Sequence, residues 1–261
     1  MKVVSEILVP ERVCQSDLEQ ALVKLGGLNG GWRKRRYPDP QQGVFYKGFL
    51  IRHLGPQIRT RLRRPHSYMG YRFGHGEARC AGLMQAAGIP VPDVYGYASW
   101  FQDIRCTAEV VAHECLSAHR TLLEALQQAE GLGSRLALLA RADRLIRLMI
   151  DAGFFHTDIH PVNLMLGQTD SDDRVIDMEA IAICKQLPPE AYPMALGELY
   201  DPPTRELISQ ADYDLWVEER LSARGLQGEG METALDFYRR VRDGWGKRKL
   251  YFRYFSGGLK K

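Results

Sequence analysis

Residues 155–177 read FHTDIHPVNLMLGQTDSDDRVID, and they place several polar side chains between two short apolar runs. Asp158 and Asn163 come just before the run LML, and Asp177 directly follows the pair VI. The turn-rich segment GQTDSDD joins the two runs, so the pattern predicts a β-hairpin. Pro161 disfavours helix in the loop before it. The hairpin therefore brings two carboxylates and one amide to the same end.

These residue types suit phosphoryl transfer. One carboxylate orients an attacking hydroxyl, while an amide and a second carboxylate hold Mg²⁺ against nucleotide phosphates. Asp and Asn are also common in turns and caps, but their spacing behind an apolar helical segment favours the chemical interpretation. His156 fits a packed, hydrogen-bonded support of the loop. His160 stays open between shaping the loop and contacting substrate.

The composition is that of an ordinary globular protein, with 45% hydrophobic and 26% charged residues in a chain of 261. That length allows one large domain or two lobes. The N-terminal segment MKVVSEILVPERV lacks the pattern of a secretory signal, so we expect a cytoplasmic protein. The five cysteines are scattered without paired metal-ligand spacing, which predicts free thiols.

Positive charge is concentrated in one part of the chain. The net charge is only +3, but residues 32–79 hold twelve Lys or Arg against two acids, Asp39 and Glu77. A solvated face would explain this surplus. An anionic partner would explain it equally well, namely phosphate, nucleic acid or a phosphorylated substrate near a membrane surface.

The N-terminal half shows mainly strand patterns. GVFY and FLIRHLG, with a turn at Lys47–Gly48, predict a hairpin. The segment GEARCAGLMQAAGIPVP predicts a helix that stops at Gly88. DVYGYASW and IRCTAEVVAH predict two further strands. Together these pieces predict a small antiparallel sheet with one helix.

From Leu122 onward the patterns are mostly helical. Residues 134–155 carry apolar side chains at helical spacing for several turns, which predicts a core helix. The tail predicts two more helices, over residues 204–225 and 231–246. The fold class is therefore α+β.

Two motifs resemble one known superfamily. HTDIHPVN, followed by Asp177 fourteen residues after Asn163, resembles the catalytic loop and metal-binding Asp of protein-kinase-like enzymes. Its His-Pro insert is similar to the aminoglycoside phosphotransferase and choline kinase variants. LIRHLG, then YRF, then Glu77 followed by GIPVP, resembles the N-terminal lobe of bacterial lipopolysaccharide core kinases, the Kdo kinase and WaaP-like heptose kinase group. The likeness covers residues 43–185, and the helical tail matches nothing.

The resemblance implies a bilobal protein-kinase-like fold, with an N-terminal lobe over residues 1–112 and a mainly helical C-terminal lobe over residues 113–261. It implies ATP and Mg²⁺ as cofactors. Carried over to this sequence, Asp158 orients or deprotonates the acceptor hydroxyl. Asn163 and Asp177 are the metal ligands.

The resemblance also implies a phosphate-binding cation that pairs with Glu77 of the N-lobe helix. The usual lysine is absent from FLIRHL, so Arg52 is the preferred candidate, because a guanidinium binds phosphate in a bidentate manner. Lys47 is the rival, at opposite strand parity. Backbone groups around Glu109 to Val111 are expected to bind an adenine edge. A glycine-rich phosphate loop is missing from the sequence, and the basic stretch is a candidate substitute.

The acceptor implied by the resemblance is a sugar hydroxyl of the lipopolysaccharide inner core, Kdo or heptose, at the cytoplasmic face of the inner membrane. The basic segments RTRLRR and GKRKLYFRYF suit an anionic glycolipid or membrane surface there. Nucleic acid is disfavoured as a partner. One alternative is a small-molecule kinase of the aminoglycoside or choline type. Another is a pseudokinase scaffold that binds nucleotide or lipid. Glu179 is either a third acid near the metals or an exposed carboxylate.

Overall fold

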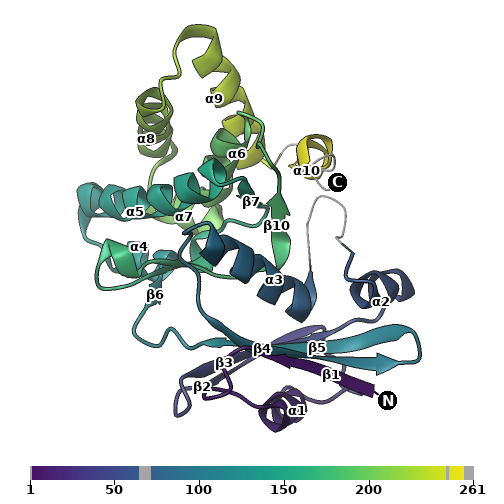
Figure 1. Ribbon diagram of the computed structural model, residues 1–261. Coiled ribbons are helices and arrows are strands. Elements are labelled where there is room, and N and C mark those ends of the chain that lie inside the picture. Colours follow the sequence, from purple (N-terminus) through teal and green to yellow (C-terminus); the bar gives the residue numbers. More distant parts are fainter. Residues whose placement is uncertain (1, 65–71, 245–246, 256–261) are drawn as a thin grey trace. The chain divides into compact units, whose positions relative to one another are not determined.

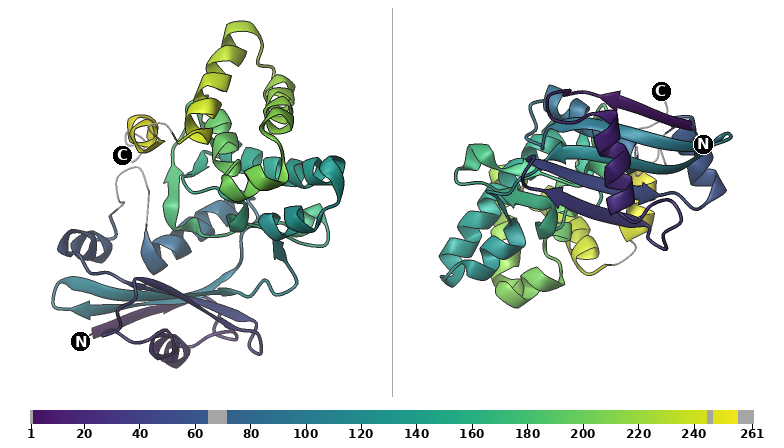
Figure 2. Two further views of the ribbon diagram at one scale, coloured as in Figure 1. Left: turned by 180° about the vertical axis from the view of Figure 1, so that it is seen from behind. Right: turned by 90° about the horizontal axis from the view of Figure 1, so that it is seen from below.

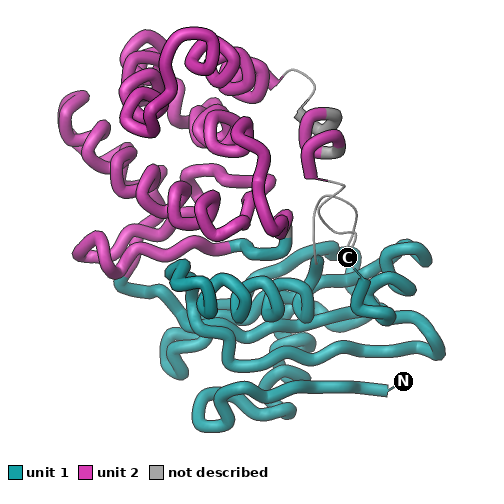
Figure 3. Tube along the Cα trace, turned by 45° about the horizontal axis from the view of Figure 1, so that its top comes forward, with its two compact units in different colours: residues 1–118, 177–181 teal, residues 119–176, 182–261 magenta. Residues whose placement is uncertain are grey.

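The computed structural model describes residues 2–64, 72–244 and 247–255. It has the α+β composition expected from the sequence and divides into two compact units (Figure 3). Unit 1 comprises residues 1–118 and 177–181, and unit 2 comprises residues 119–176 and 182–261. The boundary predicted from the sequence lies between residues 112 and 113, whereas the first segment of unit 1 continues to Ala118. Segment 177–181 joins unit 1 because its single 3₁₀ turn packs against a unit 1 helix.

Unit 1 is built on a five-stranded sheet in the order β1-β4-β5-β3-β2, in which every neighbouring pair is antiparallel (Figure 1). The strands are β1 (Lys2–Ile7), β2 (Lys34–Asp39), β3 (Val44–Leu50), β4 (Val94–Gln102) and β5 (Arg105–Glu114). The two strands predicted from DVYGYASW and IRCTAEVVAH are confirmed as the β4–β5 hairpin. This sheet positions the side chains of Lys47 and His113 in unit 1.

The hairpin predicted from GVFY and FLIRHLG is wrong, because residues 44–50 form one continuous strand, β3, whose hairpin partner is the preceding strand β2. The turn between these two strands lies at residues 40–43. The expectation of a turn at Lys47–Gly48 was wrong, because both residues lie in the middle of β3. Gly48 is required by packing: a Cβ atom there would lie 2.6 Å from Leu25 Cδ1 and 3.1 Å from Trp32 Cη2.

Helices cover both faces of this sheet (Figure 2). Helix α1 (Gln15–Lys24) packs on one face, where Tyr46, Leu50 and their neighbours form a buried apolar core. Helix α3 (Phe73–Ala86) packs on the other. It confirms the predicted helix and ends before Gly88, which has φ +77°. Helix α2 (Leu54–Arg61) follows β3 directly. The described part of unit 1 thus contains three helices where the sequence predicted one.

Unit 2 is mainly helical, as expected. Its helices are α4 (Leu122–Gln128), α5 (Gly131–Asp151), α6 (Ala191–Leu199), α7 (Pro202–Leu207), α8 (Gln210–Ala223), α9 (Gly228–Arg242) and α10 (Lys247–Phe255). Short strands form two small sheets: β6 (Arg120–Thr121), β8 (Leu164–Leu166) and β9 (Arg174–Val175) in one, and β7 (Phe154–His156) with β10 (Ile181–Ile183) in the other. Helix α5 confirms the predicted core helix, with Leu139, Leu145, Ile146 and Met149 buried.

The helical tail differs from its prediction. The segment expected as one helix over residues 204–225 is divided into α7 and α8. Ser209 causes the break: its hydroxyl accepts a hydrogen bond from the backbone N–H of Asp212 and so caps the start of α8. Asp201 caps α7 in the same way, through the N–H of Thr204.

All five cysteines are free, as expected. Across the described ranges, the helices are too short or too polar to span a bilayer. Tyr71, Gly246 and residues 65–70 of the basic stretch, which entered the sequence analysis, lie outside the described residues.

Candidate functional site

A buried ion pair joins the sheet of unit 1 to helix α3. Lys47 lies in the middle of β3 and is only 3% exposed, and its Nζ lies 2.7 Å from Oε2 of Glu77 on α3. His113 of β5 places its Nε2 3.4 Å from the other oxygen of Glu77. Burial alone lowers the pKa of Lys47, but the carboxylates of Glu77 and Asp177 outweigh it and raise that pKa above its usual value. Burial raises the pKa of Glu77, and Lys47 reverses this and lowers it. Both groups are therefore charged at neutral pH.

Asp177 lies at the centre of a group of cations. Its carboxylate pairs with Lys47 and with the Lys34 Nζ, which lies 2.9 Å from Oδ2. The Arg36 guanidinium lies 3.5 Å from the same oxygen. Burial acts to raise the pKa of Asp177, but Lys47 and Lys34 lower it well below its usual value. Glu179, left open by the sequence, pairs with Lys34 at 2.6 Å.

Arg52 is not the partner of Glu77, so that expectation was wrong. Arg52 follows the end of β3, is exposed, and donates from Nη2 to the backbone carbonyls of Trp32 and Gly30 at 3.2 and 3.4 Å. It lines a separate hollow of about 670 Å³ in unit 1. The reason is that successive side chains of β3 point to opposite faces of the sheet. Lys47 shares the α3 face of β3 with Phe49, whereas even-numbered positions such as Leu50 face α1.

Glu109 and Val111 are also placed differently from the prediction. Both lie inside β5, which is paired with β3 on one side and β4 on the other. Their backbone groups belong to a central strand with a hydrogen-bonded neighbour at each edge, so they do not offer an adenine-binding edge. The expectation was based on position along the chain, and β5 runs on to Glu114 before the connection to unit 2 begins.

The Glu109 side chain has a structural role instead. Its carboxyl group accepts hydrogen bonds from the Ser99 hydroxyl at 2.7 Å and from the backbone N–H of His75 at 3.1 Å. His75 is in the first turn of α3, whose N-cap residue makes no side-chain cap. Glu109 therefore satisfies an otherwise open N–H group of the helix that carries Glu77. Burial raises the pKa of Glu109 to about 7.

In unit 2, the predicted catalytic loop runs from β7 to β8 and contains one 3₁₀ turn, η2 (Pro161–Asn163). Pro161 begins this turn, so it limits the helix to a single turn instead of excluding it. The hairpin of β8 and β9 is confirmed. The Asp158 side chain is 53% exposed. Asn163 is buried, and its Nδ2 donates to the Asp158 backbone carbonyl at 2.8 Å. This bond fixes Asp158 and leaves the Asn163 Oδ1 as the side chain's acceptor atom.

His156 is a buried support of this loop, as the sequence indicated. Its Nδ1 accepts from the Asp158 backbone N–H at 3.2 Å. The Nε2 therefore carries the proton and donates to the Ile176 carbonyl at 3.1 Å. One imidazole thus ties the catalytic loop to the residue that precedes Asp177.

His160 lies among three carboxylates. Its Nε2 is 3.1 Å from Asp158 Oδ1 and 3.9 Å from Glu198 Oε2, and its Nδ1 is 3.5 Å from Asp201 Oδ2. Hydrogen bonds to Asp158 and Asp201 raise the pKa of His160 to about 9. The imidazole is therefore protonated at neutral pH and holds the Asp158 carboxylate. Sequence reasoning missed Glu198 and Asp201, which lie beyond the part of the chain covered by the resemblance.

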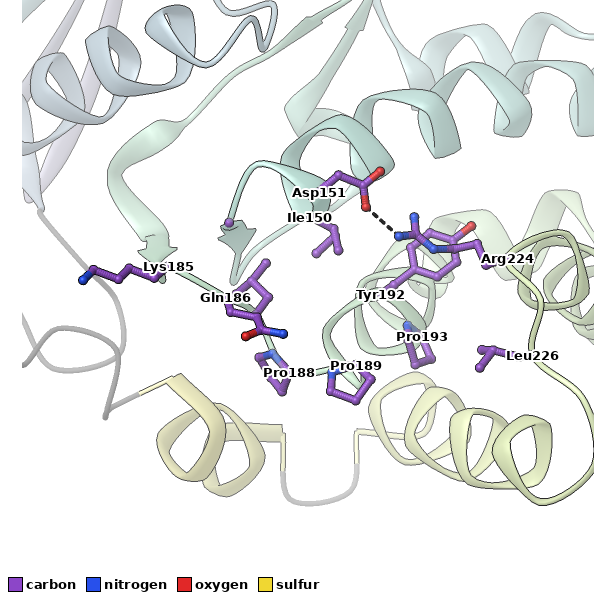
Figure 4. A pocket seen from close by; sticks show the side chains of 12 residues that line it. Ile150, Asp151, Lys185, Gln186, Pro188, Pro189, Tyr192, Pro193, Arg224 and Leu226 are labelled. Atoms are coloured by element: carbon purple, nitrogen blue, oxygen red, sulfur yellow. Dashed lines mark hydrogen bonds and ion pairs between the residues drawn. The ribbon is translucent and has the colours of Figure 1, made fainter.

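Unit 2 also contains a hollow of about 310 Å³, lined by residues of α5, α6 and the segment Lys185–Pro189 (Figure 4). An ion pair between Asp151 and Arg224 forms part of its wall at 2.5 Å. The residues predicted from the motif do not line this hollow. In the described ranges, no group of three or more His, Cys, Asp or Glu side chains is arranged so that it could hold a metal ion. A site of the predicted kind needs only one Asp and one Asn, together with phosphate oxygens.

Comparison with known proteins places the fold. No family model matches the chain, and no curated protein matches it. Among solved structures, the chain is similar to WaaP in complex with acyl carrier protein, at 18% identity and a TM-score of 0.55 over 100% of both chains. It also matches a divergent kinase lacking the glycine-rich loop, which regulates membrane ultrastructure of the Toxoplasma parasitophorous vacuole, at 12% identity, covering 90% of this chain and 91% of that one, with a TM-score of 0.45. The similarity to WaaP over the full length confirms the predicted WaaP-like, protein-kinase-like fold.

Proposed function

We propose that the protein is an ATP-dependent phosphotransferase that transfers the γ-phosphate to a hydroxyl group of its acceptor. The observation that carries the proposal is the buried pair of Lys47 on β3 and Glu77 on α3, with Asp177 against the same lysine. A strand lysine paired with a helix glutamate is the arrangement with which kinases hold nucleotide phosphates. The HTDIHPVN loop supplies the second half of the machinery.

In this proposal each polar residue has one task. Lys47 binds nucleotide phosphate oxygens and is held by Glu77. Asp177 and Asn163 offer oxygen ligands, which suit a hard cation such as Mg²⁺. The ionised Asp177 carboxylate and the Asn163 Oδ1 fit that role. When bound, the metal neutralises charge that develops on the phosphates. Asp158, exposed and held by protonated His160, orients the acceptor hydroxyl and receives its proton.

We propose a sugar of the lipopolysaccharide inner core, Kdo or heptose, as the acceptor, met at the cytoplasmic face of the inner membrane. This choice is supported by the N-terminal motifs that resemble lipopolysaccharide core kinases and by the basic segment at residues 59–64, which suits an anionic surface.

One observation favours a second acceptor class. The loop HTDIHPVN contains the pair His160–Pro161, and this insert is similar to the one in the aminoglycoside phosphotransferase and choline kinase variants. A small-molecule kinase of the aminoglycoside type is therefore the alternative.

The test is a transfer assay with labelled ATP and Mg²⁺ that offers core oligosaccharide lipids, aminoglycosides and a generic protein side by side. The wild type should label one carbohydrate class. Asp158→Asn should keep nucleotide affinity and lose transfer by at least about 10²-fold, the lower range for a positioned acid or base. Asp177→Ala should lose Mg²⁺-dependent turnover with the fold intact. A wild type that labels nothing, or full turnover in Asp177→Ala, would remove the kinase assignment.

A further inference from the structure

Two basic residues of β2 lie on the same face of the sheet as Lys47. In the β2–β3 ladder, Lys34 is opposite Phe49 and Arg36 is opposite Lys47 itself. Cross-strand partners share a face, so Lys34, Arg36 and Lys47 all project from the α3 side. Arg35 between them projects to the other side, where its Nη1 donates to the Leu25 carbonyl at 3.1 Å. Strand β2 therefore presents Lys34 and Arg36 on one face of the sheet and Arg35 on the other.

Both residues contact the carboxylate that would hold the metal. Lys34 Nζ lies 2.9 Å from Asp177 Oδ2 and 2.6 Å from Glu179 Oε1, and the Arg36 Nη2 lies 3.5 Å from Asp177 Oδ2. Their side chains are 31% and 54% exposed, in contrast to the buried Lys47. They can therefore leave these partners and reach another anion without opening the core.

The charged side chains around Asp177 balance one another. Three cations, Lys34, Arg36 and Lys47, face three carboxylates, Glu77, Asp177 and Glu179. A divalent metal taken up by Asp177 would compete with the cations for that carboxylate. The cations would then need a new anion, and a triphosphate supplies several negative oxygens within reach of one metal ion.

The sequence gives a reason why such cations are needed. A glycine-rich loop binds phosphates through backbone N–H groups, because glycine allows the backbone to approach closely. The connection between β2 and β3, residues 40–43, contains one glycine, Gly43. This connection therefore does not offer the run of glycine N–H groups that such a loop uses, and cationic side chains on β2 are an alternative source of phosphate contacts.

We propose that Lys34 and Arg36 of β2 bind the phosphates of a metal–nucleoside triphosphate in place of a glycine-rich loop, and that Asp177 and Glu179 hold them when the nucleotide is absent. This inference rests on the proposed function for the identity of the ligand. Binding of metal and nucleotide is then an exchange of partners: Asp177 passes from the cations to the metal, and the cations pass to the phosphates. Metal and triphosphate should consequently bind cooperatively.

Equilibrium binding of ATP and AMP, with and without Mg²⁺, tests this by calorimetry on the full chain. Lys34→Met and Arg36→Met should each weaken Mg²⁺–ATP binding by about 10- to 100-fold, the range for a lost charge-assisted contact. AMP binding should be unchanged, because AMP lacks the β and γ phosphates. Arg35→Met is the matched control: it removes the same charge from the same strand but from the opposite face, and should leave ATP affinity unchanged.

A second variant tests the exchange itself. Asp177→Asn removes the carboxylate that holds the cations, so it should raise the affinity for metal-free ATP several-fold while abolishing the gain that Mg²⁺ provides. The double variant Asp177→Asn with Lys34→Met should lose that increase. Metal-free affinity that falls or stays constant in Asp177→Asn overturns the proposal, as does equal behaviour of Lys34→Met, Arg36→Met and Arg35→Met.

The transfer assay separates this inference from the function on which it rests. If the wild type binds Mg²⁺–ATP with the expected variant pattern but labels no acceptor, the phosphate-binding role stands and the enzyme assignment falls. If the wild type transfers phosphate and the β2 variants bind ATP like the wild type, the enzyme assignment stands and this inference falls. A wild type that binds no ATP overturns both.

Discussion

Replacing Lys47 by methionine should destabilise unit 1 strongly, because it leaves a buried carboxylate without its main counter-charge. Glu77 is 2% exposed, and after the change the His113 imidazole at 3.4 Å is the side chain that remains beside its carboxylate. Removal of one partner from a buried ion pair typically costs about 3 to 5 kcal/mol. Asp177 still contacts Lys34 and Arg36, so most of the cost should arise at Glu77.

Urea unfolding followed by tryptophan fluorescence measures this loss, since Trp32 and Trp100 are both buried in the core of unit 1. Arg52→Met is the matched control and should cost less than about 1 kcal/mol, because that guanidinium is exposed and donates hydrogen bonds to two backbone carbonyls. In the double variant Lys47→Met with Glu77→Met, a large part of the stability should return, because no unpaired charge remains buried. If Lys47→Met costs no more than Arg52→Met, or the double variant is less stable than Lys47→Met, the pair does not have the energetic role described here.

Two further predictions concern pH and membranes. The folded pKa of Glu109 is raised to about 7, so its contribution to stability is complete below its unfolded pKa and is lost as pH rises through 7. Relative to Glu109→Gln, the wild type should therefore lose about 2 to 3 kcal/mol of unfolding free energy between pH 5 and pH 8, and a constant difference over that range would contradict the assignment. Binding to anionic vesicles should weaken with added salt, and neutralising Arg61, Arg63 and Arg64 together should remove about 1 kcal/mol per residue without changing ATP affinity; vesicle binding that ignores both changes would refute the membrane-surface proposal.

The loop between β7 and β8 could be predicted because its information is local. His156, Asp158 and Asn163 lie on this short loop, and the hairpin that follows it is encoded by adjacent turn residues and apolar pairs. Helix α5 was predictable for a similar reason, because its buried side chains recur at helical spacing over many turns.

The cationic partner of Glu77 could not be predicted, because its identity depends on a contact between distant segments. Gly48 resembles a turn residue in the sequence, yet it is glycine because Leu25 and Trp32 pack against its backbone. Leu25 ends helix α1 and Trp32 lies in the loop that follows it, and the sequence patterns did not predict this helix. Interpretation of Lys47–Gly48 as a turn places the lysine outside the strand and leaves Arg52 as the candidate cation.

Glu198 and Asp201 were missed for a different physical reason. Each is an ordinary acid near the end of a helix in sequence, and Asp201 does cap α7. Their second role depends on the tertiary position of α6 and α7 next to His160. Neither periodicity nor turn chemistry contains that information, so a structure is needed to find it.

The arrangement around Asp177 explains Glu179, which the sequence left undecided. Lys34, Arg36 and Lys47 would repel one another without nucleotide, and Glu77 and Asp177 together supply two negative charges against their three positive ones. Glu179 pairs with Lys34, the cation that also contacts Asp177, and thereby lowers the cost of gathering positive charge on this face. A backbone phosphate loop carries no such charge and needs no such acid. On the proposed exchange of partners, an extra carboxylate beside the metal-binding Asp is therefore the counterpart of cationic side chains on β2, and the two features should be retained or lost together.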